Sequence, residues 1–252
     1  MPADERPIFF IHVMKTGGTT LKHRINASFP PQAIYPNKLD DERIVVAQTD
    51  IPYLLSIDGE RRARTRIYSG HFPYVAAELL DCPLRLITLL RDPVDRVISH
   101  LKQVQKNKGG WRSFSALADV DDPSLEEVYE DDFLKRCFFL NHQVRMFAMT
   151  REDAPKTYTD LIEVDETRLQ TACANLEKVE CIGLLEQFDW FVEQMVSRFS
   201  MSAKEIAPRH VSAGGRQVSA ELRERIAHDN QLDIAFYNHA RALQQQRRSS
   251  GN

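Results

Sequence analysis

Five residues near the start of the chain have the types and the spacing of an anion-binding turn. They follow an apolar run at residues 8–13 and are Lys15, Gly17, Gly18, Thr19 and Thr20. The apolar residues after them recur at every fourth position, which predicts a helix. A strand, a tight glycine turn and a helix N-terminus direct backbone N–H groups and the positive end of a helix dipole at one point. A phosphate-like or sulfate-like anion fits such a point, and the lysine adds a full positive charge.

The order of these residues differs from that of two common nucleotide-binding motifs. In the triphosphatase P-loop the lysine follows the glycines, whereas here Lys15 precedes Gly17 and Gly18. The G-x-G-x-x-G pattern of dinucleotide-binding folds is also absent. The alternative interpretation is a strand-to-helix turn without a ligand, in which the glycines allow a sharp bend and a threonine caps the helix.

A second candidate anion ligand is Arg91, which directly follows the apolar run at residues 84–90. Asp92 and Pro93 come next and are typical of the first positions of a helix. Ser99 then lies about two helical turns further on. A guanidinium group at a strand end and a hydroxyl group on the next helix together form a good phosphate site. The alternative is a local ion pair between Arg91 and Asp92.

The alternation of strand-like and helix-like segments predicts the fold class. Predicted strands cover residues 8–13, 67–72, 84–90 and 180–184. Helical patterns between them predict an α/β fold with a mostly parallel central sheet flanked by helices. Ligands of such sheets bind beyond the carboxyl ends of the strands. Because Lys15, His71 and Arg91 each follow a predicted strand, we expect them to converge on one crevice.

Other segments give a coarser prediction. The whole chain, 1–252, is predicted to be one domain with a disordered tail at 247–252. Residues 124–149 are predicted to be helical, and residues 231–246 are predicted to form the last helix. Residues 44–46 fit either a strand or the start of a helix.

Composition excludes several classes of function. The chain has 252 residues and a formal net charge of −3, which argues against a general nucleic-acid-binding protein. No apolar run reaches the roughly 20 residues that a membrane span needs. The four cysteines are scattered, and no secretory signal is recognisable at the N-terminus. These features predict reduced thiols and a cytoplasmic protein, and they leave the oligomeric state open.

Two motifs resemble those of sulfotransferases that use 3′-phosphoadenosine 5′-phosphosulfate (PAPS). The sequence K-T-G-G-T-T at 15–20 resembles the loop that binds the 5′-phosphosulfate, and R-D-P-V-D-R-V-I-S at 91–99 resembles the segment that binds the 3′-phosphate. Y-S-G-H-F at 68–72 and N-H-Q-V-R-M-F-A at 141–148 are similar to the glycan 2-O-sulfotransferase-like branch. Met14 departs from that branch, which commonly has proline there.

The resemblance implies a P-loop-like sulfotransferase fold and an enzyme of the EC 2.8.2 type. It would transfer a sulfuryl group from PAPS to a hydroxyl of a carbohydrate or other alcohol, with 3′,5′-adenosine bisphosphate as the product and no metal. Lys15 would stabilise the leaving phosphate and His71 would act as the general base. The implied cofactor ligands are Lys15, Thr16, Gly17, Gly18, Thr19, Thr20, Arg91, Ser99, Arg209 and Ser212. His142 and Arg145 are weaker candidates for acceptor binding.

Two alternatives stay open at this point. A small-molecule kinase would need ATP and Mg²⁺, and the reversed order of lysine and glycine argues against it. A non-catalytic protein of the same fold would bind the product nucleotide without turnover.

Overall fold

A five-stranded parallel sheet forms the centre of the molecule. The computed structural model describes residues 4–38, 40, 44–155, 161–204 and 217–250. The strands are β1 (Ile8–Ile11), β2 (Ile34–Tyr35), β3 (Ile67–Tyr68), β4 (Arg85–Leu90) and β5 (Cys181–Leu184). Their order is β2-β3-β1-β4-β5, and every pairing is parallel. The predicted α/β class is therefore confirmed.

The central strand β1 is buried on both of its faces. Phe9 pairs with Tyr68 of β3 and with Leu86 of β4. Side chains alternate between the two faces of a strand, so Ile8 and Phe10 lie in one hydrophobic cluster whereas Phe9 belongs to another. This explains why the segment reads as an unbroken apolar run.

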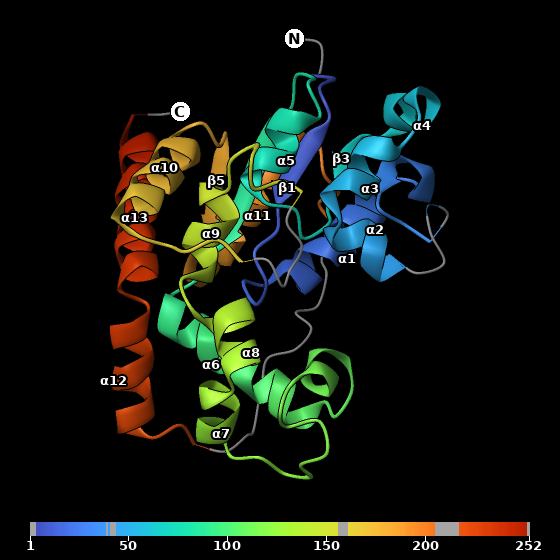
Figure 1. Cartoon of the computed structure of the whole chain (residues 1–252). Helices are drawn as coiled ribbons and strands as arrows, with labels where there is room; N and C mark the ends of the chain where they lie inside the picture. Colours follow the sequence, from blue (N-terminus) through green and yellow to red (C-terminus); the bar gives the residue numbers. More distant parts are fainter. Residues whose placement is uncertain (1–3, 39, 41–43, 156–160, 205–216, 251–252) are drawn as a thin grey trace.

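Helices cover both faces of the sheet (Figure 1). Helices α1 (Gly18–Ser28) and α11 (Phe188–Phe199) pack on one face. The other face is covered by α3 (Ile51–Ser56), α5 (Tyr74–Leu79), α9 (His142–Ala148), α10 (Glu166–Glu177) and α13 (Gln231–Ser249). Helix α2 (Ile44–Thr49) contacts the segment after β3, since the His71 N–H donates to the Gln48 carbonyl at 2.6 Å, and Arg61 of α4 (Gly59–Arg64) donates to the Ile34 carbonyl of β2 at 2.6 Å.

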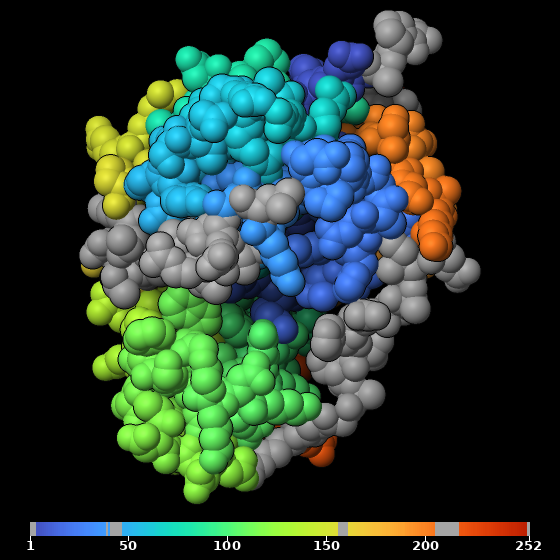
Figure 2. Space-filling model, turned by 90° about the vertical axis from the view of Figure 1, so that its right-hand side faces the viewer, coloured from blue at the N-terminus to red at the C-terminus, as the bar shows by residue number. Residues whose placement is uncertain are grey.

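A third hydrophobic cluster lies past the carboxyl ends of the strands. It joins α6 (Pro93–Lys106), α7 (Leu125–Glu130), α8 (Asp132–Leu134), the wide turn of π-helix at Lys135–Phe139 and α12 (Ala220–Asp229). In Figure 2 the green part of the chain, which includes α7, lies below the blue and cyan N-terminal part. None of the helices in the described ranges has the length and the apolar composition needed to cross a membrane.

The structure refines several predicted boundaries. Strand β2 was not predicted, and residues 44–46 begin a helix rather than a strand. The predicted helical region 124–149 is divided, because Asp131 caps a new turn at Leu134 and Asn141 has a left-handed φ of 42°.

Helix α13 continues to Ser249, so residues 247–249 of the predicted disordered tail are helical. Arg247 anchors this end by donating to the carbonyls of Val179 (2.6 Å) and Glu177 (2.7 Å). The division of the chain into domains is not tested by the fold, so one domain over 1–252 stays a prediction.

Candidate functional site

The turn after β1 has the backbone geometry that an anion site needs. Lys15 has a φ of 70° and Gly17 a φ of 92°, and α1 begins at Gly18. The left-handed conformation explains the glycine at position 17. The first N–H groups of α1 have no partner within the helix. Thr16 is buried and uses its hydroxyl inside the turn, donating to the Val13 carbonyl at 2.9 Å, so its contribution to a ligand would come from its backbone.

Thr19 and Thr20 are the second and third residues of α1. Thr19 is exposed and Thr20 is half-buried, and the Thr20 N–H donates to the Gly17 carbonyl at 3.1 Å. The Thr20 N–H is therefore already used by the turn.

Gly18 is required by a close approach to His12. A Cβ atom on Gly18 would lie 1.7 Å from His12 Nε2. The His12 ring in turn stacks between Phe10 and His71, with ring centroids 4.7 and 4.0 Å away. Because Gly18 has no side chain, the start of α1 can pack directly against the His12 ring, which stacks on His71.

We expect Gly18→Ala to lower the free energy of unfolding by about 1–3 kcal/mol, because the added methyl group must displace the His12 ring. Urea unfolding of the variant measures this change. Gly59→Ala is the matched control, since a Cβ at Gly59 has no atom within 4 Å. Equal unfolding midpoints for both variants and the parent protein would contradict the proposed packing role.

Arg91 and Lys15 meet at the carboxyl ends of neighbouring strands. Arg91 Nη1 donates to the Lys15 carbonyl at 3.3 Å, and Lys15 Nζ donates to Gln103 Oε1 at 2.9 Å. Ser99 is half-buried one helical turn before Gln103 on α6. Asp92 caps α6 as predicted, accepting from the Asp95 N–H at 3.0 Å.

The two cations at this point lack a close carboxylate. Within the described parts of the chain, neither Lys15 nor Arg91 has a carboxylate at ion-pair distance. Burial, and then the charges of Arg91 and Arg96, lower the pKa of Lys15. Burial also lowers the pKa of Arg91, although Asp95 and Asp92 oppose that shift. Positive side chains without an ion-pair partner beside a helix N-terminus favour the binding of an anion.

His71 follows β3, the strand beside β1, and one of its two ring nitrogens already makes a hydrogen bond. Its Nδ1 atom is 3.1 Å from the His12 carbonyl. Since a carbonyl can only accept, Nδ1 carries the proton and Nε2 keeps the free lone pair. Burial lowers the pKa of His71 to about 4, against a smaller opposite effect of the His12 carbonyl. The imidazole is therefore neutral at pH 7 and able to accept a proton at Nε2.

Four histidines make stability depend on pH in a defined window. Burial lowers the pKa of His12, His71, His100 and His142 below the ordinary value of 6.5. The unfolded chain then binds more protons than the folded chain below pH 6.5, so this stabilisation is complete above that pH and is lost as the pH falls. Between about pH 6 and 5 we expect the free energy of unfolding to fall by about 1.4 kcal/mol per pH unit for each histidine. Urea unfolding across this window measures the slope, and a flat profile would contradict these pKa shifts.

The two weaker acceptor candidates differ in burial: His142 is buried and Arg145 is half-buried. His142 is buried, and neither ring nitrogen has a hydrogen-bond partner among the described residues. Arg145 donates to the carbonyls of Cys137 and Leu140, both at 3.1 Å. This geometry gives Arg145 a structural function in the wide turn. Acceptor binding by either residue stays a prediction, and the predicted ligands Arg209 and Ser212 lie outside the described residues.

Two glutamines and one arginine of this region were not predicted from the sequence. Gln103 contacts Lys15, and Gln143 contacts the backbone of Arg91. Arg96 is fully buried and donates to the carbonyls of Phe138 (2.9 Å) and Phe139 (3.2 Å). Arg96 lies in the motif at 91–99 and Gln143 in the motif at 141–148. The distance along the sequence between each residue and its partner follows no pattern that would predict the contact.

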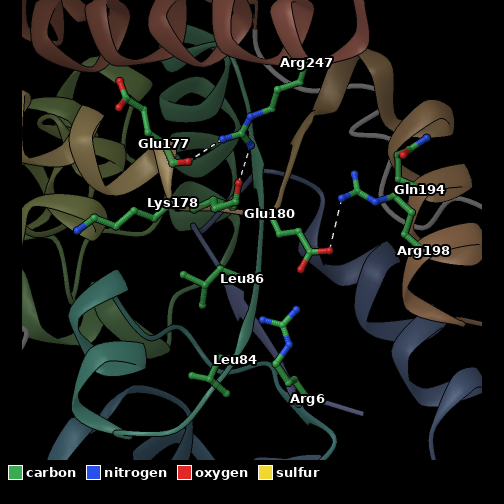
Figure 3. A pocket seen from close by; sticks show the side chains of 10 residues that line it. Arg6, Leu84, Leu86, Glu177, Lys178, Glu180, Gln194, Arg198 and Arg247 are labelled. Carbon is green, nitrogen blue, oxygen red and sulfur yellow. Dashed lines mark hydrogen bonds and ion pairs between the residues drawn. The ribbon is translucent and has the colours of Figure 1, made fainter. Parts of the chain in front are cut away.

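A cavity of about 830 Å³ lies at the opposite end of the sheet (Figure 3). It is lined by Leu84 and Val179, which precede β4 and β5. Its basic side chains already have partners: Arg198 is 3.4 Å from Glu180, and Arg247 donates to backbone carbonyls. The predicted anion site is therefore separate from this cavity.

Comparison with known proteins finds sulfotransferases of one kind. No family model matches the chain. Human heparan-sulfate 6-O-sulfotransferase 1 is 26% identical over 275 residues, which cover 95% of this chain and 66% of that protein. The chicken (Gallus gallus) heparan-sulfate 6-O-sulfotransferase 1 is 30% identical over 94% of this chain and 65% of its own length. Human heparan-sulfate 6-O-sulfotransferase 3 is 29% identical over 68% of this chain and 41% of that protein.

The chain thus spans about two thirds of the length of the first of these relatives. The predicted branch needs a correction, because the relatives found are 6-O-sulfotransferases rather than 2-O-sulfotransferases. The similarity extends over nearly the whole chain, and each of these relatives is a heparan-sulfate 6-O-sulfotransferase.

Proposed function

We propose that the protein transfers a sulfuryl group from PAPS to a hydroxyl group of a glycan. The observation that carries this proposal is the contact between Arg91 and the Lys15 turn, because one nucleotide with a 3′-phosphate and a 5′-phosphosulfate needs two cationic sites side by side. The names of the relatives favour a heparan-type acceptor and its 6-hydroxyl group. A cytoplasmic location and independence from metal remain predictions.

Each residue of the site has a proposed part in holding the donor. The N–H groups at the start of α1 and the hydroxyls of Thr19 and Thr20 would bind the 5′-phosphate. Arg91 and Ser99 would bind the 3′-phosphate, Arg91 from the end of β4 and Ser99 from about two turns into α6. Lys15 would bind the oxygen that bridges phosphorus and sulfur.

Bound PAPS would supply an activated sulfuryl group. In the proposed reaction the acceptor oxygen forms a bond to sulfur while the bond from sulfur to the 5′-phosphate oxygen breaks, which releases 3′,5′-adenosine bisphosphate. His71 Nε2 takes the acceptor proton, and Lys15 stabilises the charge that develops on the leaving phosphate. Positioning and charge stabilisation contribute most to related phosphoryl transfers.

A transfer assay with labelled PAPS and heparan sulfate tests this function. We expect labelled glycan and a matching release of 3′,5′-adenosine bisphosphate. Phosphate transfer from ATP and Mg²⁺ to the acceptor would instead support the kinase alternative. Binding of the bisphosphate without transfer to any of several glycans would support a non-catalytic nucleotide-binding protein.

A further inference from the structure

The side-chain amide of Gln143 holds the backbone of Arg91 at two points. Gln143 Oε1 accepts from the Arg91 N–H at 3.2 Å, and Gln143 Nε2 donates to the Arg91 carbonyl at 2.9 Å. Gln143 is fully buried. Arg91 lies one residue beyond the last sheet pairing of β4, at Leu90, so the amide takes the place that a neighbouring strand would otherwise occupy.

Gln143 is itself fixed by the last helix. Its N–H donates to Asp233 Oδ2 at 3.1 Å, and the N–H of Val144 donates to Asp233 Oδ1 at 2.8 Å. Asp233 is fully buried on α13, and its own N–H donates to Asn141 Oδ1 at 3.0 Å. These hydrogen bonds connect α13, the start of α9 and the end of β4 in one continuous chain.

The position of the Arg91 backbone determines two features of the candidate site. The Arg91 side chain contacts the Lys15 carbonyl, and the next residue, Asp92, caps α6. A rotation of this backbone would move the guanidinium group away from the turn.

We propose that Gln143 is a positioning residue that orients Arg91 for binding the 3′-phosphate of the nucleotide, an inference that rests on the proposed function. It contributes through the geometry of Arg91 rather than through contact with the ligand. Its loss should therefore weaken the binding of 3′,5′-adenosine bisphosphate while leaving 5′-AMP, which lacks the 3′-phosphate, nearly unaffected.

The test is calorimetric titration of Gln143→Leu with both nucleotides. We expect Kd for the bisphosphate to rise at least tenfold, as the loss of both hydrogen bonds suggests. Gln244→Leu is the matched control, because Gln244 is also buried and donates to a strand carbonyl, that of Ile182, at 3.1 Å. Both variants should unfold at lower temperature than the parent protein, but only Gln143→Leu should change Kd for the bisphosphate.

A double variant separates positioning from general destabilisation. In an Arg91→Ala background, Gln143→Leu should change Kd less than twofold, since its effect acts through Arg91. An unchanged Kd in Gln143→Leu, or a full tenfold effect in the Arg91→Ala background, would overturn the inference while leaving the proposed function intact. An unchanged Kd in Arg91→Ala itself would overturn both.

If Gln143→Leu does not fold, Gln143→Glu provides the same information. Burial raises the pKa of a carboxyl group, so at low pH the introduced O–H can donate to the Arg91 carbonyl and at high pH it cannot. The ratio of variant to parent Kd should therefore rise as the pH increases and the introduced carboxyl group loses its proton. A ratio near one at every pH would contradict the proposed role.

Discussion

Replacing His71 with alanine should lower kcat by about 10²–10⁴-fold, the usual contribution of a general base. The reason is the hydrogen bond from Nδ1 to the His12 carbonyl, which leaves Nε2 as the proton acceptor. Kd for 3′,5′-adenosine bisphosphate should stay near the parent value, because His71 is assigned to the acceptor rather than to the nucleotide. Transfer assays and calorimetry measure the two effects separately.

Two controls accompany this prediction. His228→Ala removes a histidine whose side chain is 80% exposed, and it should leave kcat unchanged. The pH profile of kcat/KM reports the base of the free enzyme, and its acid limb should lie near the lowered pKa of about 4 rather than near 6.5. Full activity of His71→Ala would show that another group accepts the proton.

Lys15→Met should lower kcat by about 10²–10³-fold, as expected when one group that stabilises transition-state charge is removed. Methionine keeps most of the apolar stem but removes the ammonium group, which in the folded protein has only the neutral Gln103 amide as a described partner. Lys102→Met on α6 is the control, since it removes an equal charge without altering the turn. A similar small effect of both substitutions would contradict the assigned role of Lys15.

The sequence predicted the strands on either side of the candidate site better than the segments around them. Strands β1 and β4 are apolar on both faces, and each ends at a glycine turn or at Asp-Pro, so local signals were sufficient there. Strand β2 has two residues and depends on its pairing with β3, which no local pattern reveals. The wide turn Lys135–Phe139 is similar, because the guanidinium groups of Arg96 and Arg145 bind its carbonyls from other segments.

Residues of the candidate site also differ in whether local sequence or distant contacts determine their place. The places of Lys15, His71 and Arg91 could be predicted because each follows a strand of a parallel sheet, and their roles stay predictions. The function of Gln143 depends on Asp233, 90 residues further along the chain, and on the point where β4 leaves the sheet. Such a residue is found only when both partners are placed in space.

The central claim is that Arg91 and the Lys15 turn hold opposite phosphates of one adenosine nucleotide. Calorimetric titration with 3′,5′-adenosine bisphosphate and with 5′-AMP tests it most directly, in the parent protein and in Arg91→Ala. We predict that the parent protein binds the bisphosphate at least tenfold more tightly, which corresponds to about 1.4 kcal/mol, and that Arg91→Ala removes this preference. Equal affinity of the parent protein for the two nucleotides, or a preference that survives in Arg91→Ala, would contradict the account.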